Sequence, residues 1–152
     1  MQAHELAAPY PTIRLDTSAL EAARLLADRR LPGLIVVDDR DHPVAVLPGS
    51  QLLRLIIPRY VQDDPALARV LDEAHADRLC DILAGKTVAD LLPKDRTPLP
   101  VAAPDDTVME IAALMAAQRS PLVAVVEADS KTAPLLGAIS VAQLLARLLP
   151  ER

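Results

Sequence analysis

The sequence contains no tryptophan or phenylalanine, and Tyr10 and Tyr60 are the only aromatic residues among its 152. It also lacks a cluster of basic residues, because 16 lysines and arginines are outnumbered by 21 aspartates and glutamates, for a net charge of −5. Proteins that bind nucleic acid use basic grooves, and many stack bases on aromatic rings. The composition therefore excludes nucleic acid as an expected partner.

Cysteine and glycine are also scarce. Cys80 is the only cysteine, so no disulfide can form within the chain, and zinc sites made of several cysteines are excluded. The four glycines are too few for a glycine-rich phosphate loop, and no nucleophile elbow or zinc-protease motif is present. These absences predict a protein that is not an enzyme, holds no metal and requires no cofactor.

Long apolar runs are missing as well, although 51% of the residues are hydrophobic. No run approaches the ~18 residues of a membrane span, and residues 1–5 lack the basic and apolar regions of a signal peptide. A single cysteine is typical of a reducing compartment. We therefore expect a cytoplasmic protein with no membrane insertion.

What the chain does contain is an internal repeat. Residues 12–23 match residues 101–112, and the register continues from residues 30–38 to residues 119–127. After the next turn, which is longer in the second copy, residues 46–53 match residues 138–145. A single change of offset, located in a loop, is what a duplicated domain should show.

Both copies carry the same local signals. Ser18 with Glu21, and Thr107 with Glu110, have the spacing of a capping box, so an amphipathic helix should begin at each and end before the next proline. The apolar runs that follow are typical of strands buried on both faces. The expected unit is extended segment, helix, strand, turn, strand, helix. Its later elements cover residues 34–37, 44–47 and 50–57 in the first copy and residues 122–126, 136–139 and 141–149 in the second.

An insertion separates the copies. Residues 63–85 have apolar residues at helical spacing, with Pro65 suited to a first helical position and Gly85 to a stop, so we expect inserted helix there. The predicted domains are a first repeat over residues 1–58, a helical linker over residues 59–86 and a second repeat over residues 87–152.

The order of motifs resembles a cystathionine-beta-synthase (CBS) domain. The resemblance rests on Val-Ala-Asp-Leu-Leu at 88–92, Pro-Asp-Asp-Thr-Val at 104–108, the Ser-Pro step and strand at 120–126, and Leu-Gly-Ala-Ile-Ser at 136–140. Two tandem copies resemble a CBS pair, or Bateman module. The resemblance implies an α/β (α+β) fold of two βαββα units packed with pseudo-two-fold symmetry, which commonly form homodimers.

Such a pair, by resemblance, senses AMP, ADP, ATP or another adenosyl ligand in clefts between the repeats and regulates an enzyme or a transporter. The family's binding pattern is Gly-x-hydrophobic-Ser/Thr-x-x-Asp, in which the hydroxyl meets phosphate and the aspartate holds the ribose. The second copy matches it at Gly137, Ile139 and Ser140 but has Gln143 for the aspartate. The residues that correspond to the base pocket are Pro121, Leu122 and Val123.

The first copy departs further from this pattern. Ala45 replaces the glycine, Pro48 the hydroxyl residue and Gln51 the aspartate, so its cleft is expected to be a poor nucleotide site. The residues that complete this degenerate cleft are Pro32, Leu34 and Arg54.

Several of these residues have a second, purely structural interpretation. Ser140 suits a phosphate contact or an ordinary helix cap, and Gln143 and Gln51 suit a ligand contact or an exposed first turn. Arg54 suits phosphate or solvent. His75 and Cys80, with Asp72 and Asp77, suggest a metal cluster only superficially, because His75 and Cys80 do not have the spacing of ligands on one helix face.

Three hypotheses remain. The first is a stand-alone regulatory CBS pair that senses a small ligand in the cleft of the second copy and signals to a partner protein. The second is a ligand-free dimeric scaffold with degenerate nucleotide sites. The third, a small enzyme, lacks the converging acid, base or nucleophile that catalysis requires.

Overall fold

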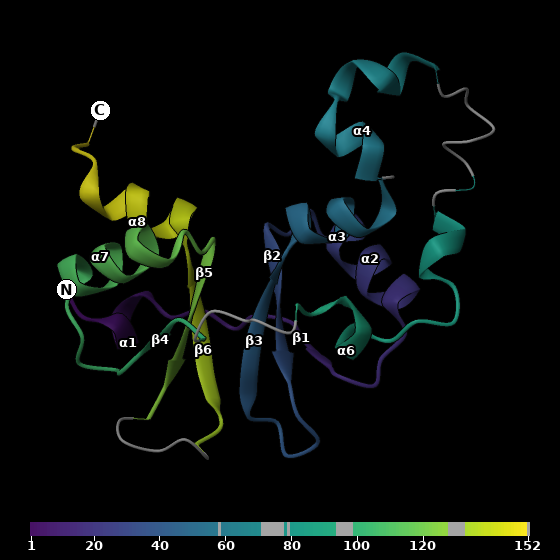
Figure 1. The fold of residues 1–152 in the computed structure, drawn as a ribbon. Coiled ribbons are helices and arrows are strands. Elements are labelled where there is room, and N and C mark those ends of the chain that lie inside the picture. The colour runs from purple at the N-terminus through teal and green to yellow at the C-terminus, as the bar shows by residue number, and fades with distance from the viewer. Residues whose placement is uncertain (58, 71–77, 79, 94–98, 128–132, 152) are drawn as a thin grey trace.

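The computed structural model describes residues 1–57, 59–70, 78, 80–93, 99–127 and 133–151. Two three-stranded sheets lie side by side at its centre, each accompanied by helices of its own repeat (Figure 1). The first repeat consists of β1 (Thr12–Arg14), α2 (Ala19–Asp28), β2 (Gly33–Val37), β3 (Pro43–Pro48) and α3 (Gly49–Ile56). The second consists of β4 (Val101–Ala102), α7 (Val108–Gln118), β5 (Leu122–Val126), β6 (Leu135–Ser140) and α8 (Val141–Leu148).

The two sheets have the same topology. In each, the first strand is parallel to the second, and the second is antiparallel to the third. Gly49 N–H donates to Pro32 O at 3.1 Å, and Val141 N–H donates to Pro121 O at 3.2 Å. The final helix of each repeat therefore begins beside the start of its central strand, which confirms the predicted βαββα unit.

The helix starts follow the capping signals. Thr107 and Glu110 form both bonds of a capping box, whereas at Ser18 the structure gives only the bond from Glu21 N–H to the hydroxyl, at 3.1 Å. The following proline does not end either helix directly. An arginine in the left-handed region follows each helix: Arg30 lies two residues after the end of α2, and Arg119 directly follows α7, both with φ 51°.

The short helix that precedes each repeat in the sequence packs against the other repeat. α1 (Ala3–Leu6) packs in the core of the second repeat, and α6 (Val88–Leu91) packs in the core of the first. Matching backbone bonds hold them: Ala3 N–H donates to Asp106 O at 2.8 Å, and Val88 N–H donates to Thr17 O at 2.9 Å. The two repeats are therefore interlocked.

A third core cluster joins the sheets at the pseudo-two-fold axis. It consists of fully or nearly fully buried residues of β2, β5 and β6, namely Ile35, Val37, Leu122, Ala124 and Ala138. Because β2 and β5 are buried along their whole length, both faces of each strand must be apolar, as the continuous hydrophobic runs predict.

The described part of the insertion is helical, as predicted, and its helices are short. It contains α4 (Arg59–Asp63) and two 3-10 helices, η1 (Pro65–Val70) and η2 (Cys80–Leu83), while residues 71–77 lie outside the described structure. Pro65 begins a helix as expected, but Asp64 favours the tighter turn, because its carbonyl accepts from Leu67 N–H at 3.0 Å. Gly85, with φ +77°, follows η2 as the predicted stop.

The described residues contain no helix that is long and apolar enough to cross a bilayer. They also contain no group of three or more histidine, cysteine, aspartate or glutamate side chains placed to hold a metal ion. The cluster of Asp72, His75, Asp77 and Cys80 falls outside the side chains that the structure describes.

Candidate functional site

A cavity of about 310 Å³ lies between the two repeats. The junction of β3 and α3 forms one wall, the end of α7 forms another, and the segments on either side of residues 94–98 complete it. We call it the first cleft. Its lining residues are Ala45, Val46, Leu47, Pro48, Gln51, Arg54, Leu92, Pro93, Leu99, Pro100, Gln118, Arg119 and Ser120.

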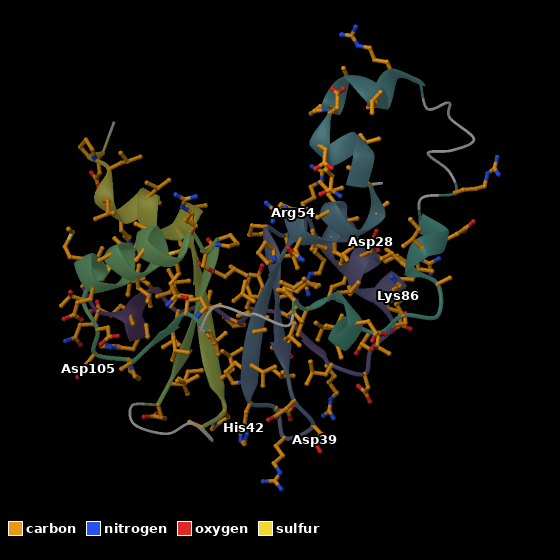
Figure 2. All side chains as sticks on the ribbon, in the orientation of Figure 1. Asp28, Asp39, His42, Arg54, Lys86 and Asp105 are labelled. Atoms are coloured by element: carbon orange, nitrogen blue, oxygen red, sulfur yellow. The ribbon has the colours of Figure 1, made fainter. Side chains whose placement is uncertain are left out.

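The polar wall of the first cleft is basic although the chain is acidic. Arg54 comes from the last turn of α3, and Arg119 is the left-handed residue after α7, so the two cations come from different repeats. Figure 2 shows Arg54 on the side of α3 that faces the second repeat. None of the described lining residues is acidic, and neither arginine forms an ion pair within the described structure. The cleft therefore favours an anion.

Two further features leave hydrogen-bonding groups available in this cleft. Pro48 is the N-cap of α3 and provides no side-chain hydrogen bond, so no side chain caps the first turn. The side-chain oxygen of Gln118 is buried and has no partner among the described residues. The hydroxyl of Ser120, in contrast, donates to Leu122 O at 2.6 Å.

The corresponding region of the second repeat, the second cleft, has a different arrangement. Ser140 N–H donates to Gln143 Oε1 at 2.8 Å, and Gln143 N–H donates to Ser140 Oγ at 3.3 Å. The other side-chain atom, Gln143 Nε2, is 3.5 Å from Leu6 O. Both side chains thus form a capping box at the start of α8.

The N-terminal segment also covers this side of β6. Ala8 and Ala138 exchange backbone hydrogen bonds of 3.1 and 3.0 Å. A Cβ placed on Gly137 would lie 2.9 Å from Ala8 O and 3.2 Å from Ala7 Cβ. Glycine at this position therefore allows close backbone approach of the chain's own N-terminal segment.

Tyr10 holds that segment to the first repeat. Its hydroxyl donates to Gly33 O at 2.7 Å, and its ring packs against the cluster between the sheets. Burial raises the pKa of Tyr10 above its ordinary value of 10.0. The hydroxyl is thus a neutral, structural donor.

Comparison with known proteins gives the family. The CBS domain family model matches residues 4–58 and 88–150. The chain belongs to the CBS domain family. A CBS domain-containing protein of unknown function from Kribbella flavida is 51% identical, with a TM-score of 0.81 and 99% of both chains covered. No curated protein matches the chain.

Two further solved structures share the fold of this CBS pair. The CBS domain of a membrane protein from Sphaerobacter thermophilus is 25% identical, with a TM-score of 0.70 and coverage of 99% of this chain and 90% of that one. CBSX2, a CBS-pair protein of Arabidopsis thaliana, was solved in complex with AMP. That structure is 23% identical, with a TM-score of 0.67 and coverage of 97% of this chain and 95% of that one.

The structure separates the residues that the sequence assigned to ligand binding. Pro48, Gln51 and Arg54 of the first CBS repeat meet in the first cleft, whereas Pro32 lines a wider groove. Leu34 is buried in the core of the first repeat. In the second repeat, Pro121 lines the same groove as Pro32, and the fully buried side chains of Leu122, Val123 and Ile139 belong to the core clusters. Ligand binding around Gly137, Ser140 and Gln143 stays a prediction.

Sequence reasoning missed the contribution of the second repeat to the first cleft. Gln118 and Arg119 lie at the end of α7, far along the chain from Pro48 and Gln51. A signal was available, because Arg30 before Pro32 matches Arg119 before Pro121 in the repeat alignment. This alignment showed that the two arginines occupy equivalent positions in the two repeats. It did not show which cleft each arginine would line.

Proposed function

We propose that this CBS pair is a regulatory module that senses an adenine nucleotide or a related small ligand between its repeats. The observation that carries the proposal is the first cleft, which combines apolar walls with Arg54 and Arg119 and has no acidic residue among its described lining. Small-molecule sites typically have cavities of this size, mostly apolar, with a few polar groups. The complex of the related CBSX2 with AMP supports a ligand of this class.

The placement of the cleft provides a mechanism of regulation. A ligand that contacts Arg54 and Arg119 bridges the two repeats, so it favours the arrangement in which both side chains reach it. Ligand binding shifts an equilibrium only through different affinities for the two states. A partner protein, an enzyme or a transporter, then responds to the arrangement of the repeats. The module itself performs no reaction in this proposal.

The module acts as a homodimer in this proposal. α8 exposes Leu145 and Leu148, and Leu149 directly follows it; the three residues are 47%, 44% and 62% accessible. Leu145 and Leu148 line a groove of about 750 Å³ that runs from α7 and α8 to the start of α3. A contiguous apolar patch on a protein of this size marks an interaction surface. Because the two repeats are equivalent, a face built from elements of both is suited to a second copy of itself.

Thermal unfolding of the purified protein with AMP, ADP, ATP, adenosine and S-adenosylmethionine tests the proposed sensor. A ligand at 100 times its dissociation constant adds about 2.7 kcal/mol to the unfolding free energy, which is a shift of several degrees at this size. A shift with any of these ligands supports the sensor. No shift with any of them contradicts it.

A ligand-free dimeric scaffold is the second candidate. It is favoured by the second cleft, where Ser140 and Gln143 bond to each other and the N-terminal segment covers Gly137. In this candidate the apolar face of α8 and the insertion bind other proteins. The same thermal panel separates the two functions, because a scaffold shows no shift.

A further inference from the structure

We infer that the first cleft recognises its ligand by phosphate, through Arg54 and Arg119 together, and does not discriminate ribose from deoxyribose. This inference rests on the proposed function and specifies the ligand chemistry of that site. In this inference, one arginine from each repeat distinguishes ligands that carry phosphate from ligands that do not. The site belongs to the first cleft, although the sequence of the first repeat departs further from the family's binding pattern.

The ribose part of the inference follows from the acceptors in the cleft. Recognition of two neighbouring hydroxyls requires a group that accepts from both, and an ionised carboxylate does so strongly. Gln51 occupies the corresponding position and offers one neutral amide oxygen. Since no described lining residue is acidic, removal of the 2′-hydroxyl deprives the ligand of no charge-assisted bond.

The phosphate part follows from the donors. A guanidinium group presents several N–H donors in a planar fork that matches phosphate oxygens. Arg54 and Arg119 both line the cleft, and within the described structure neither is held by a carboxylate. The first turn of α3 has no side-chain cap, and although Gly49 N–H already donates to Pro32 O, the turn adds the following backbone N–H donors and the positive end of a helix dipole beside Gln51.

A third observation indicates that the cleft is completed by a ligand. The buried Gln118 Oε1 accepts no hydrogen bond from the described residues. A buried acceptor without a hydrogen-bond donor lowers the stability of the folded protein, and a ligand that donates to it removes this cost. An exocyclic amino group, such as that of adenine, provides a donor. An adenine nucleotide has this amino group at one end and phosphates at the other, so a single ligand offers a donor to Gln118 and acceptors to the two arginines.

Arg30 and Arg147 are matched controls for the two arginines. Arg30 has the same left-handed φ of 51° as Arg119 at the equivalent helix end of the first repeat, but it does not line the first cleft. Arg147 lies in the last turn of α8, as Arg54 lies in the last turn of α3, and it too does not line the cleft. Replacing Arg30 or Arg147 by alanine changes the net charge by the same amount as replacing Arg54 or Arg119.

Isothermal titration of the full chain with ATP, dATP and adenosine tests the inference. We expect dATP to bind within about two-fold of ATP, and adenosine to bind at least about ten-fold more weakly, since it forms no charge-assisted bonds to the arginines. Arg54→Ala and Arg119→Ala should each weaken ATP binding at least about ten-fold and leave adenosine binding nearly unchanged. Arg30→Ala and Arg147→Ala should retain wild-type affinity, and circular dichroism checks that all four variants are folded.

The outcomes separate the inference from the function on which it rests. If ATP binds but dATP is ten-fold weaker, or adenosine binds as tightly as ATP, then recognition through phosphate without ribose discrimination is wrong, while the nucleotide sensor stands. The inference is also wrong if Arg30→Ala or Arg147→Ala weakens ATP binding as much as Arg54→Ala does. If none of the three ligands binds, both the inference and the proposed sensor are overturned.

Discussion

Gln143 caps the same helix turn that Ser140 begins: its side-chain oxygen accepts from Ser140 N–H at 2.8 Å while its own N–H donates to the Ser140 hydroxyl at 3.3 Å. The equivalent pair in the first repeat, Pro48 and Gln51, forms no such box, because proline has neither the hydroxyl nor the N–H. The same glutamine therefore has two roles in the two repeats. Gln143 caps the start of α8, and Gln51 lines the first cleft.

Gln143→Ala should lower the free energy of unfolding by about 1 kcal/mol, because it removes one bond of the capping box. Gln51→Ala, the matched change in the first repeat, should leave stability nearly unchanged. Chemical denaturation of the two variants and the wild type measures both effects. Equal losses of stability would show that the capping box does not distinguish the two glutamines.

Gly137→Ala should destabilise the protein by about 1–3 kcal/mol. The added methyl group would lie 2.9 Å from Ala8 O, so the N-terminal segment would have to move away from β6. Gly49→Ala is the control, since its nearest neighbour is a Leu26 methyl group at 3.4 Å, an ordinary contact. Thermal unfolding of both variants provides the comparison. A Gly137→Ala protein as stable as the wild type would contradict the close approach of Ala8.

The turn between β2 and β3 should weaken in acid. Asp38 Oδ1 accepts from the backbone N–H groups of His42 and Arg40, both at 2.9 Å. The bond from His42 is the main reason that the pKa of Asp38 is lower than its ordinary value of 3.8. The unfolded chain therefore takes up this proton first as the pH falls, so the contribution to stability is present above pH 3.8 and is lost as the pH falls through the folded pKa.

Carbon-detected NMR of the side-chain carboxyl measures this effect, with a titration midpoint for Asp38 expected below 3.8. Asp38→Asn retains an acceptor for the two backbone N–H groups but does not titrate, so its stability should depend less on pH in this range. A midpoint at or above 3.8 would refute the role given to His42 N–H.

If the protein forms the proposed homodimer, replacing Leu145 and Leu148 together by glutamate should convert it to a monomer. Two charges on the exposed face of α8 cannot be buried against a second copy without a large desolvation cost. Leu136→Glu is the control, because Leu136 is as exposed as Leu145, at 47%, but lies on β6. Light scattering at tens of micromolar measures the mass. A wild-type monomer would contradict the proposed homodimer.

The elements that the sequence predicted correctly depend on local signals. The hydroxyl of Thr107 and the carboxylate of Glu110 fix a helix start through neighbours three residues apart, and the apolar run of β5 requires burial wherever it packs. The repeat then supplied the topology, since two equivalent units must fold alike. In the described part of the insertion the predicted helical segment is confirmed, and η1 is a 3-10 helix because Asp64 competes locally for backbone N–H groups.

The residues that line the first cleft could not be predicted from local sequence signals, because they come from both repeats. Arg119 and Gln51 line the same cavity only because the packing of the two repeats places the end of α7 opposite the start of α3. The contrast between the clefts also depends on the lengths of two connections. The chain from α1 to β1 is short and pairs Ala8 with Ala138, whereas the chain from α6 to β4 is longer.

A crystal structure of the protein grown with ATP tests the central claim most directly, because it locates the ligand. We predict electron density for the nucleotide in the first cleft, with its phosphates against Arg54 and Arg119. Density against Ser140 and Gln143 with an empty first cleft, or no nucleotide density in crystals grown at a saturating concentration, would contradict the account.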